Sequence, residues 1–171
     1  MPQELKMKNR IYCELKKIMS EPCSEYIVHT DNIDNDEGIY NWNLTIIGPM
    51  DTVYEGELLE ATLAFPENYP WAPPVFTFKT DIWYPNVYRD KDPLVNGKVC
   101  ISILHLGDDE TGYESRSERW SPILNTNSII QSIINLLIEP NPNSPANLDA
   151  AKELIQSNDT YLNTVKKCLV R

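Results

Sequence analysis

The spacing of apolar residues predicts one helix and then several strands in the first half of the chain. From Glu4 to Met19 the apolar residues recur at helical spacing, and this helix is expected to end near Ser20. Residues Tyr40 to Ile47 and Leu59 to Phe65 instead alternate apolar and polar, a period of two that is typical of half-buried antiparallel strands. Val75 to Phe78 is expected as a further strand. A small sheet packed on the first helix follows.

Helical spacing returns only after residues 80–122, which show no clear period. Irregular segments of this length are uncommon in compact domains and often contain functional residues, so we expect the functional site there. Helices are then predicted from Ile129 to Leu137 with Asn125 or Thr126 as cap, from Ser144-Pro145 to about Ile155, and from Asp159 to Val170. The order helix, strands, irregular segment, helices predicts an α+β fold.

Length and charge narrow the class of protein. A chain of 171 residues that is 42% hydrophobic is expected to form one compact domain, residues 1–171. A net charge of −10 argues against a nucleic-acid partner, because such binding needs a basic face. The first 17 residues are the exception, with the basic residues Lys6, Lys8, Arg10, Lys16 and Lys17 against Glu4 and Glu14. This helix could dock an acidic partner, or its charges could form a solvated face.

The four cysteines indicate a reducing compartment. They show no C-x-x-C spacing and are too few for a disulfide framework in a chain of this size. No apolar stretch reaches 18 residues, and the polar start lacks the apolar core of a secretory signal. We therefore expect a monomer in the cytoplasm or nucleus, without a membrane span.

Cys100 is the strongest candidate for a reactive group. Cys13 and Cys168 lie in helical patterns, where a buried structural thiol is the usual fate, and Cys23 has no supporting context. Cys100 follows a polar turn and has irregular chain on both sides, with the side-chain amide of Asn86 in the same segment. From residue context alone, a functional and a structural role for Cys100 both stay open.

An asparagine amide near a nucleophilic sulfur suits acyl transfer, since a fixed donor stabilises the oxyanion of the tetrahedral intermediate. Asn86 could equally cap a turn after Pro85, and the two roles are compatible. A cysteine hydrolase would need a histidine base beside the thiol, and His105 lies five residues beyond Cys100. With only one other histidine, His29, and no glycine-rich elbow around the cysteine, a hydrolase is disfavoured. Metal ligands do not cluster, so a metal site is not expected.

Five motifs in order identify a resemblance over nearly the whole chain. They are Tyr69-Pro-Trp-Ala-Pro-Pro74, Tyr84-Pro-Asn86, Gly97 to Cys100, Trp120-Ser-Pro122 and Pro140-Asn-Pro142. Together they resemble the ubiquitin-conjugating enzyme family. The resemblance implies a four-stranded antiparallel meander flanked by an N-terminal helix and C-terminal helices. It implies that Cys100 receives ubiquitin as a thioester from the activating enzyme and passes it to lysine, with no cofactor and no metal.

A subgroup within this family is also indicated. Cys100 to His105, Gly107 to Asp109 and Gly112 to Ser115 resemble the subgroup with an acidic loop behind the active cysteine. That resemblance implies ubiquitin chains through lysine 48 and ligases of protein quality control, with recruitment to the ER surface by a partner as one possibility. The loop residues expected to orient the acceptor lysine are His105, Asp108, Asp109 and Glu110, joined by Glu114 and Glu118. The alternative is a merely solvated loop.

The resemblance also implies partner surfaces. Trp71 and the Ser121-Pro122 turn resemble the two loops that seat a RING-type ligase, where an exposed Trp would anchor the partner. A buried Trp71 is the alternative. Arg10, with Lys6 beside it on the first helix, matches the basic surface that docks the activating enzyme, although Cys13 stands where the family has a nearby lysine.

Two departures from the family pattern lie at the site itself. Tyr84 replaces a histidine that braces the loop bearing the asparagine, and a phenol could brace it with a different reach. About six extra residues separate Asn86 from Cys100, as a surface bulge or as an insertion that displaces Asn86. These departures leave two alternatives to an active conjugating enzyme, which are a non-catalytic adaptor of the same fold and a carrier of another ubiquitin-like protein.

Overall fold

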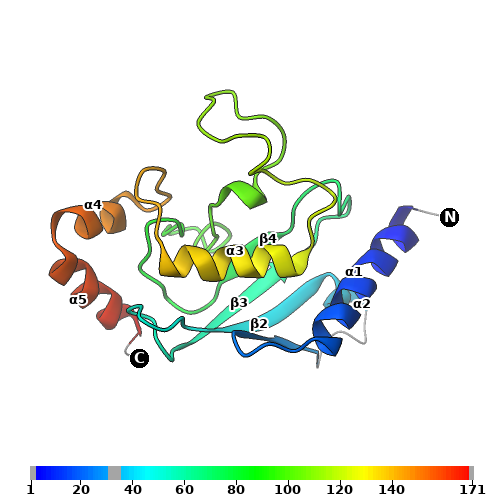
Figure 1. Cartoon of the computed structure of the whole chain (residues 1–171), viewed down its shortest axis with the longest axis horizontal. Coiled ribbons are helices and arrows are strands. Elements are labelled where there is room, and N and C mark those ends of the chain that lie inside the picture. Colours follow the sequence, from blue (N-terminus) through cyan, green and yellow to red (C-terminus); the bar gives the residue numbers. More distant parts are fainter. Residues whose placement is uncertain (1–2, 31–35, 170–171) are drawn as a thin grey trace.

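The computed structural model describes residues 3–30 and 36–169 and has the α+β architecture expected from the sequence (Figure 1). The helices and strands, in chain order, are α1 (Gln3–Ser20), β1 (Tyr26–His29), α2 (Asp36–Ile39), β2 (Asn41–Ile47), β3 (Leu58–Ala64), β4 (Val75–Phe78), the 3-10 helix η1 (Ser102–Leu104), α3 (Thr126–Ile138), α4 (Leu148–Gln156) and α5 (Asn158–Leu169). None of the helices in these two ranges is long and apolar enough to cross a membrane.

The sheet is an antiparallel meander with the strand order β1-β2-β3-β4. Its register pairs Leu44 on β2 with Val28 on one side and with Ala61 on the other, and all three side chains are buried. The predicted alternation is present, because each buried position is followed by a more exposed one along most of β2 and β3. The apolar period of two therefore fixes which face of the sheet packs on the core.

Helix α3 lies across one face of the sheet, with α1 at one end of the molecule and α4 and α5 at the other (Figure 1). Its buried residues are Thr126, Ile129, Ile130, Ile133, Ile134, Leu136 and Leu137, which join the sheet and α1 in one core. The N-cap of α3 is Asn125, whose side chain accepts a hydrogen bond from Ser128 N at 3.0 Å. This confirms the first of the two cap candidates.

The predicted helix start at Ser144-Pro145 is wrong. Helix α4 begins at Leu148, and Asn147 is its N-cap. The reason lies in contacts from distant residues, because the backbone N–H groups of Ala146 and Asn147 both donate to Pro85 O at 2.8 Å. The segment before α4 is therefore tied to the chain around residue 85 and is not free to form a helical turn.

Candidate active site

Cys100 lies in an extended segment held between β4 and the residues that follow Pro85. Its backbone N–H donates to Asn86 O at 2.9 Å, and Val87 and Val99 form an isolated antiparallel bridge. On the other side Val99 N donates to Phe76 O at 3.0 Å. The thiol of Cys100 is half buried.

Gly97 starts this segment because no other residue fits there. Its φ is +82°, and a Cβ at this position would lie 2.3 Å from Phe78 O. The close approach allows Phe78 N to donate to Gly97 O at 2.9 Å. The glycine of the Gly-x-x-Cys pattern thus fixes the register that presents Cys100.

The chain then turns back so that an imidazole faces the thiol. The 3-10 turn Ser102–Leu104 is closed by His105 N donating to Ser102 O at 2.9 Å. His105 Nε2 lies 3.4 Å from Cys100 Sγ. His105 Nδ1 lies 2.9 Å from Glu114 Oε2 and 3.0 Å from Oε1. A thiol, an imidazole and a carboxylate are therefore linked by successive contacts. The sequence left the Cys100–His105 pair open but did not indicate Glu114 as its third member.

Glu114 is itself held in place by its neighbours. Ser102 Oγ donates to Glu114 Oε1 at 2.8 Å, and Arg119 Nη1 lies 3.1 Å from Glu114 Oε2. The backbone N–H of Glu114 donates to Asp109 Oδ2 at 2.8 Å. Only 12% of the Glu114 side chain is exposed, against 33% for His105. The carboxylate that holds the imidazole is thus largely removed from water.

The electrostatics favour a thiolate and an imidazolium in the free protein. The hydrogen bond from His105 lowers the pKa of Cys100, against the opposing effect of burial. The same contact with Cys100, assisted by Glu114, raises the pKa of His105 to about 9. The Tyr88 phenol also lowers the pKa of the thiol. Sequence reasoning missed Tyr88, because its pairing with Lys98 across the insertion is visible only in the fold.

The side chain of Asn86 is 2% exposed and is fully engaged with the backbone of a distant turn. Its Nδ2 donates to Asn141 O at 2.9 Å and to Ser144 O at 3.1 Å, while its Oδ1 accepts from Asn141 N at 3.0 Å. Both amide hydrogens are therefore committed to carbonyls. The amide could face an oxyanion only after releasing one of these bonds.

Tyr84 links the segment that bears Asn86 to helix α3. Its side chain is buried, its hydroxyl donates to Leu136 O on α3, and its ring centroid lies 6.0 Å from that of Tyr54. Burial raises the pKa of Tyr84 well above its usual value, so the phenol stays protonated as a donor. A phenol thus reaches from the active-site loop to the central helix.

The extra residues between Asn86 and Cys100 form a surface turn. Gly97 N donates to Tyr88 O at 2.8 Å, which closes the excursion at its base. At its tip the Asp92 side chain accepts from Leu94 N at 2.9 Å. Because Asn86 and Cys100 pair directly through their backbones, the insertion lengthens the surface without separating these two residues.

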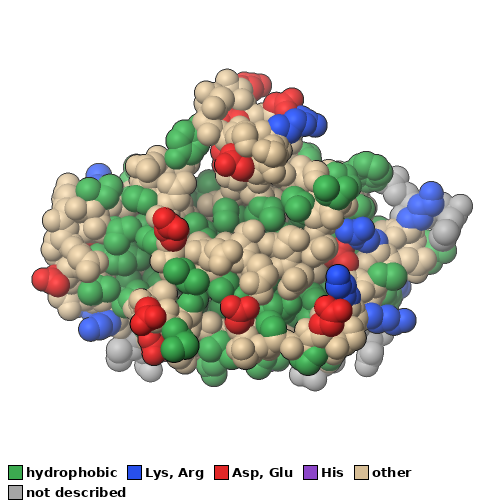
Figure 2. Space-filling view, in the orientation of Figure 1, with side chains coloured by type: hydrophobic (Ala, Val, Ile, Leu, Met, Phe, Trp, Pro, Cys, Tyr) green, Lys and Arg blue, Asp and Glu red, His purple; other side chains and the backbone are tan. Residues whose placement is uncertain are grey.

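The acidic loop, residues 105–120, projects from the body of the molecule, and acidic side chains lie around its tip (Figure 2). Asp109 is turned inward, where it accepts from Thr111 N at 3.0 Å and from Glu114 N. These hydrogen bonds hold the pKa of Asp109 well below its usual range. Glu118 accepts from Ser115 N at 2.8 Å. Glu110, Glu118 and Asp108, which pairs with Arg116, are the exposed acids of the loop, and Asp109 and Glu114 are partly buried.

The candidate ligase surface is accessible. Trp71 is 65% exposed, which decides against the alternative of a buried side chain. Ser121 and Pro122 are partly exposed beside it. Trp120 joins the two loops, because it is buried and its Nε1 donates to Pro70 O at 2.8 Å.

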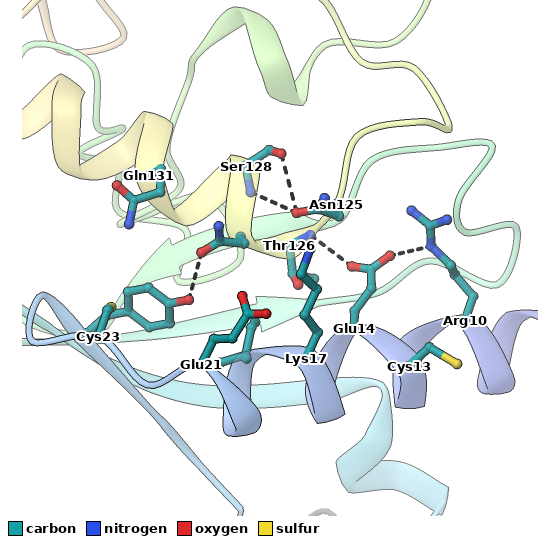
Figure 3. A pocket seen from close by; sticks show the side chains of 13 residues that line it. Arg10, Cys13, Glu14, Lys17, Glu21, Cys23, Asn125, Thr126, Ser128 and Gln131 are labelled. Atoms are coloured by element: carbon teal, nitrogen blue, oxygen red, sulfur yellow. Dashed lines mark hydrogen bonds and ion pairs between the residues drawn. The ribbon is translucent and has the colours of Figure 1, made fainter.

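The basic surface of α1 is only partly free. Lys6 is exposed, but Arg10 pairs with Glu14 and donates from Nη2 to Leu124 O at 3.0 Å. Figure 3 shows Glu14 pointing from α1 toward Arg10 and the backbone of Thr126, beside a cavity of about 440 Å³. Blue side chains nevertheless gather over this end of the molecule in Figure 2.

The comparisons with known proteins agree with this arrangement. The sequence profile described as "Ubiquitin-conjugating enzyme" matches residues 10–169. The chain belongs to the ubiquitin-conjugating enzyme family. It is 45% identical over 157 residues to ubiquitin-conjugating enzyme E2 13 of Arabidopsis thaliana, covering 91% of this chain and 89% of the relative. It is 43% identical over 159 residues to ubiquitin-conjugating enzyme E2 15 of Schizosaccharomyces pombe, covering 92% and 90%.

Membership confirms the family, the fold and the enzyme class that the motifs predicted. Ubiquitin, an activating enzyme and a ligase are the partners that go with this family. Within residues 3–30 and 36–169 no three His, Cys, Asp or Glu side chains are placed to hold a metal ion. The roles of individual residues in this ubiquitin-conjugating enzyme stay predictions.

Proposed function

We propose that this enzyme accepts ubiquitin as a thioester on Cys100 and passes it, with a RING-type ligase, to lysine amines. The observation that supports this most strongly is the half-exposed thiol of Cys100, 3.4 Å from the His105 imidazole at the cysteine position of the family pattern. A thiolate is the attacking species in thioester exchange, and the imidazole favours its formation.

A charging assay tests this proposal. The full chain is incubated with ubiquitin, activating enzyme and ATP, and a thiol-sensitive adduct is expected. Cys100→Ala should abolish the adduct, whereas Cys23→Ala, which alters an exposed cysteine far from His105 in sequence, should leave it unchanged. An adduct that persists in Cys100→Ala would refute the assignment.

We also propose that the acidic loop favours chains through lysine 48 of ubiquitin. In this proposal Asp108 and Glu110 attract the acceptor lysine from solvent, Asp109 shapes the loop, and His105 faces the acceptor beside the thioester. Linkage analysis of chains made from a mixture of wild-type ubiquitin and ubiquitin lacking lysine 48 tests the preference.

Asn86 and Tyr84 are assigned supporting roles in transfer. Tyr84 holds the loop on α3, and Asn86 holds the turn at residues 141–144 beside the site. We keep the oxyanion donor role for Asn86 as a proposal in which one of its bonds to the turn is exchanged for the substrate. The test of this role is given in the Discussion.

The partner surfaces are proposed on exposure and charge. Trp71, Ser121 and Pro122 would seat the ligase, since they lie on two loops that Trp120 joins. Lys6 and Arg10 would meet the activating enzyme, with Lys6 offering the more accessible charge because Arg10 is bonded within the protein. We expect one catalytic domain over residues 1–171, acting as a monomer in the cytoplasm or nucleus, with recruitment to the ER surface by a partner.

Two alternatives share the fold. The adaptor hypothesis drew on Tyr84 and the insertion, yet Tyr84 braces the loop and Cys100 keeps a base beside it, which favours a carrier. Discharge of charged Cys100 to free lysine would end the adaptor hypothesis. Parallel charging with other ubiquitin-like proteins and their own activating enzymes separates the remaining alternative.

A further inference from the structure

The thiol, imidazole and carboxylate of Cys100, His105 and Glu114 form the same chain of contacts that activates nucleophiles in cysteine hydrolases. In such a chain the carboxylate fixes the tautomer and the orientation of the imidazole. Here Glu114 binds Nδ1, so Nε2 is the nitrogen that faces the sulfur. A conjugating enzyme that only passes ubiquitin to lysine has little need of this arrangement.

Lysine and hydroxyl acceptors differ in what they require from the site. A lysine amine has a pKa of about 10.4, so roughly one molecule in a thousand is neutral near pH 7.4 and can attack without a base. An alcohol resembles water, whose pKa is about 15.7, and must lose its proton as it attacks. A positioned base typically accelerates such a step by about 10²–10⁴.

We infer that His105, held by Glu114, is a general base that lets the Cys100 thioester be transferred to hydroxyl groups as well as to lysine amines. The inference rests on the proposed function, because it requires Cys100 to carry the thioester. His105 is then a catalytic residue and Glu114 a positioning residue. The substrate class is a serine or threonine side chain of an acceptor protein.

The step balances without any further reactant. The acceptor oxygen bonds to the thioester carbonyl carbon while its proton passes to His105 Nε2. The tetrahedral intermediate then expels the Cys100 sulfur as a thiolate, breaking the carbon–sulfur bond. The products are an oxyester, a thiolate at Cys100 and an imidazolium at His105, two forms that the contact between these side chains stabilises.

Acylation prepares His105 for this role. The contact with Cys100 is the largest cause of the raised pKa of His105, and it is lost when the sulfur becomes part of a thioester. The pKa of His105 should then fall, so that a neutral imidazole faces the acyl carbon. The charged or titratable groups around it are Cys100, Tyr88, Glu114, Arg119 and Asp109.

The acceptor has a route to the imidazole. A cavity of about 500 Å³ lies between the acidic loop and the turn before α4, lined by His105, Tyr113, Glu114, Arg119 and Ser144 among others. A third of the His105 side chain is exposed. The cavity therefore gives an acceptor side chain access to the His105 ring from the loop side.

The first test uses the wild-type full chain. It is charged with ubiquitin, ATP is removed, and the thioester is offered Nα-acetyl-serine amide or Nα-acetyl-lysine amide. We expect a serine adduct that hydroxylamine cleaves, formed faster as pH rises and His105 loses its proton. A lysine adduct without any serine adduct would overturn the inference and leave the proposed function standing. Failure to charge would overturn both.

The second test compares variants in the same single-turnover assay. His105→Gln should slow discharge to serine by about 10²-fold or more, with a much smaller effect on lysine discharge at a pH where the amine is largely neutral. His29→Gln, which alters the other histidine at an exposed position of β1, is the matched control. Equal slowing of both acceptors by His105→Gln would overturn the inference.

Glu114 is tested through the pH profile. Because Glu114 raises the pKa of His105, Glu114→Gln should move the rise of serine discharge to lower pH and reduce its plateau, and Glu114→Asp should restore part of both. A purely structural role would change the amount of folded enzyme without moving the profile. An unmoved profile in Glu114→Gln would refute the positioning role.

Discussion

The polar side chains around Cys100 divide into those that act on the sulfur and those that hold the backbone near it. His105 contacts the thiol, and His105 and Tyr88 both lower its pKa. Asn86 and Tyr84, the residues of the family tripeptide, instead bind backbone carbonyls of other segments. The residue types of the tripeptide were readable in the sequence, but their bonding partners were not, because those partners lie about 50 residues away or more.

The division predicts how the thiol titrates. His105→Gln should move the pH dependence of iodoacetamide alkylation at Cys100 to higher pH, because the largest cause of its lowered pKa is removed. Tyr88→Phe should move it in the same direction by less. Alkylation rates across pH, with the site identified by peptide mass, give the profiles. Unchanged profiles in both variants would show that neither group stabilises the thiolate.

Asn86→Ala should lower the free energy of unfolding of the enzyme, apart from any effect on ubiquitin transfer. The change leaves the backbone groups of Asn141 and Ser144 without their partner in a partly buried turn, at a cost of about 1–3 kcal/mol. Thermal unfolding should show a fall in Tm of several degrees.

The same variant also tests the donor role of Asn86. We expect charging to stay nearly intact and transfer to lysine to slow by about 10-fold or more, since the donor acts on the oxyanion of aminolysis. A fall in Tm with unchanged transfer would make Asn86 a purely structural residue. An unchanged Tm with slowed transfer would mean that the hydrogen bonds from Asn86 to the turn contribute little to stability.

At the scale of elements, the acidic loop shows what composition can and cannot predict. The sequence indicated a cluster of acids behind the cysteine, and the structure sorts them by partner. Asp109 and Glu114 are partly buried and accept hydrogen bonds that shape the loop. Asp108, Glu110 and Glu118 are exposed, and Glu118 also accepts from Ser115 N. Charge is visible in a sequence, but the turn that decides which carboxylate points inward is set by local backbone geometry.

Asp108 and Asp109 should therefore respond differently to substitution. Asp108→Lys reverses an exposed charge and should reduce lysine-48 chain formation while charging and Tm stay near wild type. Asp109→Ala removes the acceptor for Glu114 N and Thr111 N, so it should loosen the loop and reduce both charging and chain formation. Quantitative gels of charging and of chain formation measure the two effects. Equal effects of the two variants would contradict this assignment.

The helix after residue 144 marks the limit of pattern reading for elements. Ser144-Pro145 has the composition of a helix start, yet the chain around it is bonded to Pro85 and Asn86. The apolar period located β2, β3, α3 and α5 because those elements bury their faces in the core, whereas the four-residue β1 was not predicted. It could not locate a boundary that depends on the active-site loop.

At the scale of the molecule, one buried carboxylate joins three segments that carry the proposed partner surfaces. Glu14 on α1 accepts from the Tyr69 hydroxyl at 2.8 and 2.9 Å. It also accepts from Thr126 N at 2.8 Å and pairs with Arg10 (Figure 3). Tyr69 lies 55 residues from Glu14 in the sequence, and Thr126 lies 112 residues from it. No local pattern could have predicted these partners, although helical spacing places Glu14 at the edge of the apolar face formed by Ile11 and Ile18.

Glu14→Gln should weaken the junction of α1, the loop bearing Trp71 and the start of α3. A buried carboxylate that accepts several hydrogen bonds cannot be matched by an amide, which presents only one acceptor oxygen, and each hydrogen bond to a charged group contributes about 1.5–3 kcal/mol. For a domain of this size, each kcal/mol lowers Tm by about 2–4 °C. Hydrogen exchange should speed up at residues 66–71 and 124–128 more than at the sheet.

Because Cys100 and His105 do not contact this junction, charging at 25 °C should persist while the response to a RING ligase falls. Lys6→Gln, an exposed change on the same helix, is the control and should leave Tm and exchange unchanged. Uniform acceleration of exchange across the whole protein would instead mean that Glu14 sets global stability and does not couple the partner surfaces.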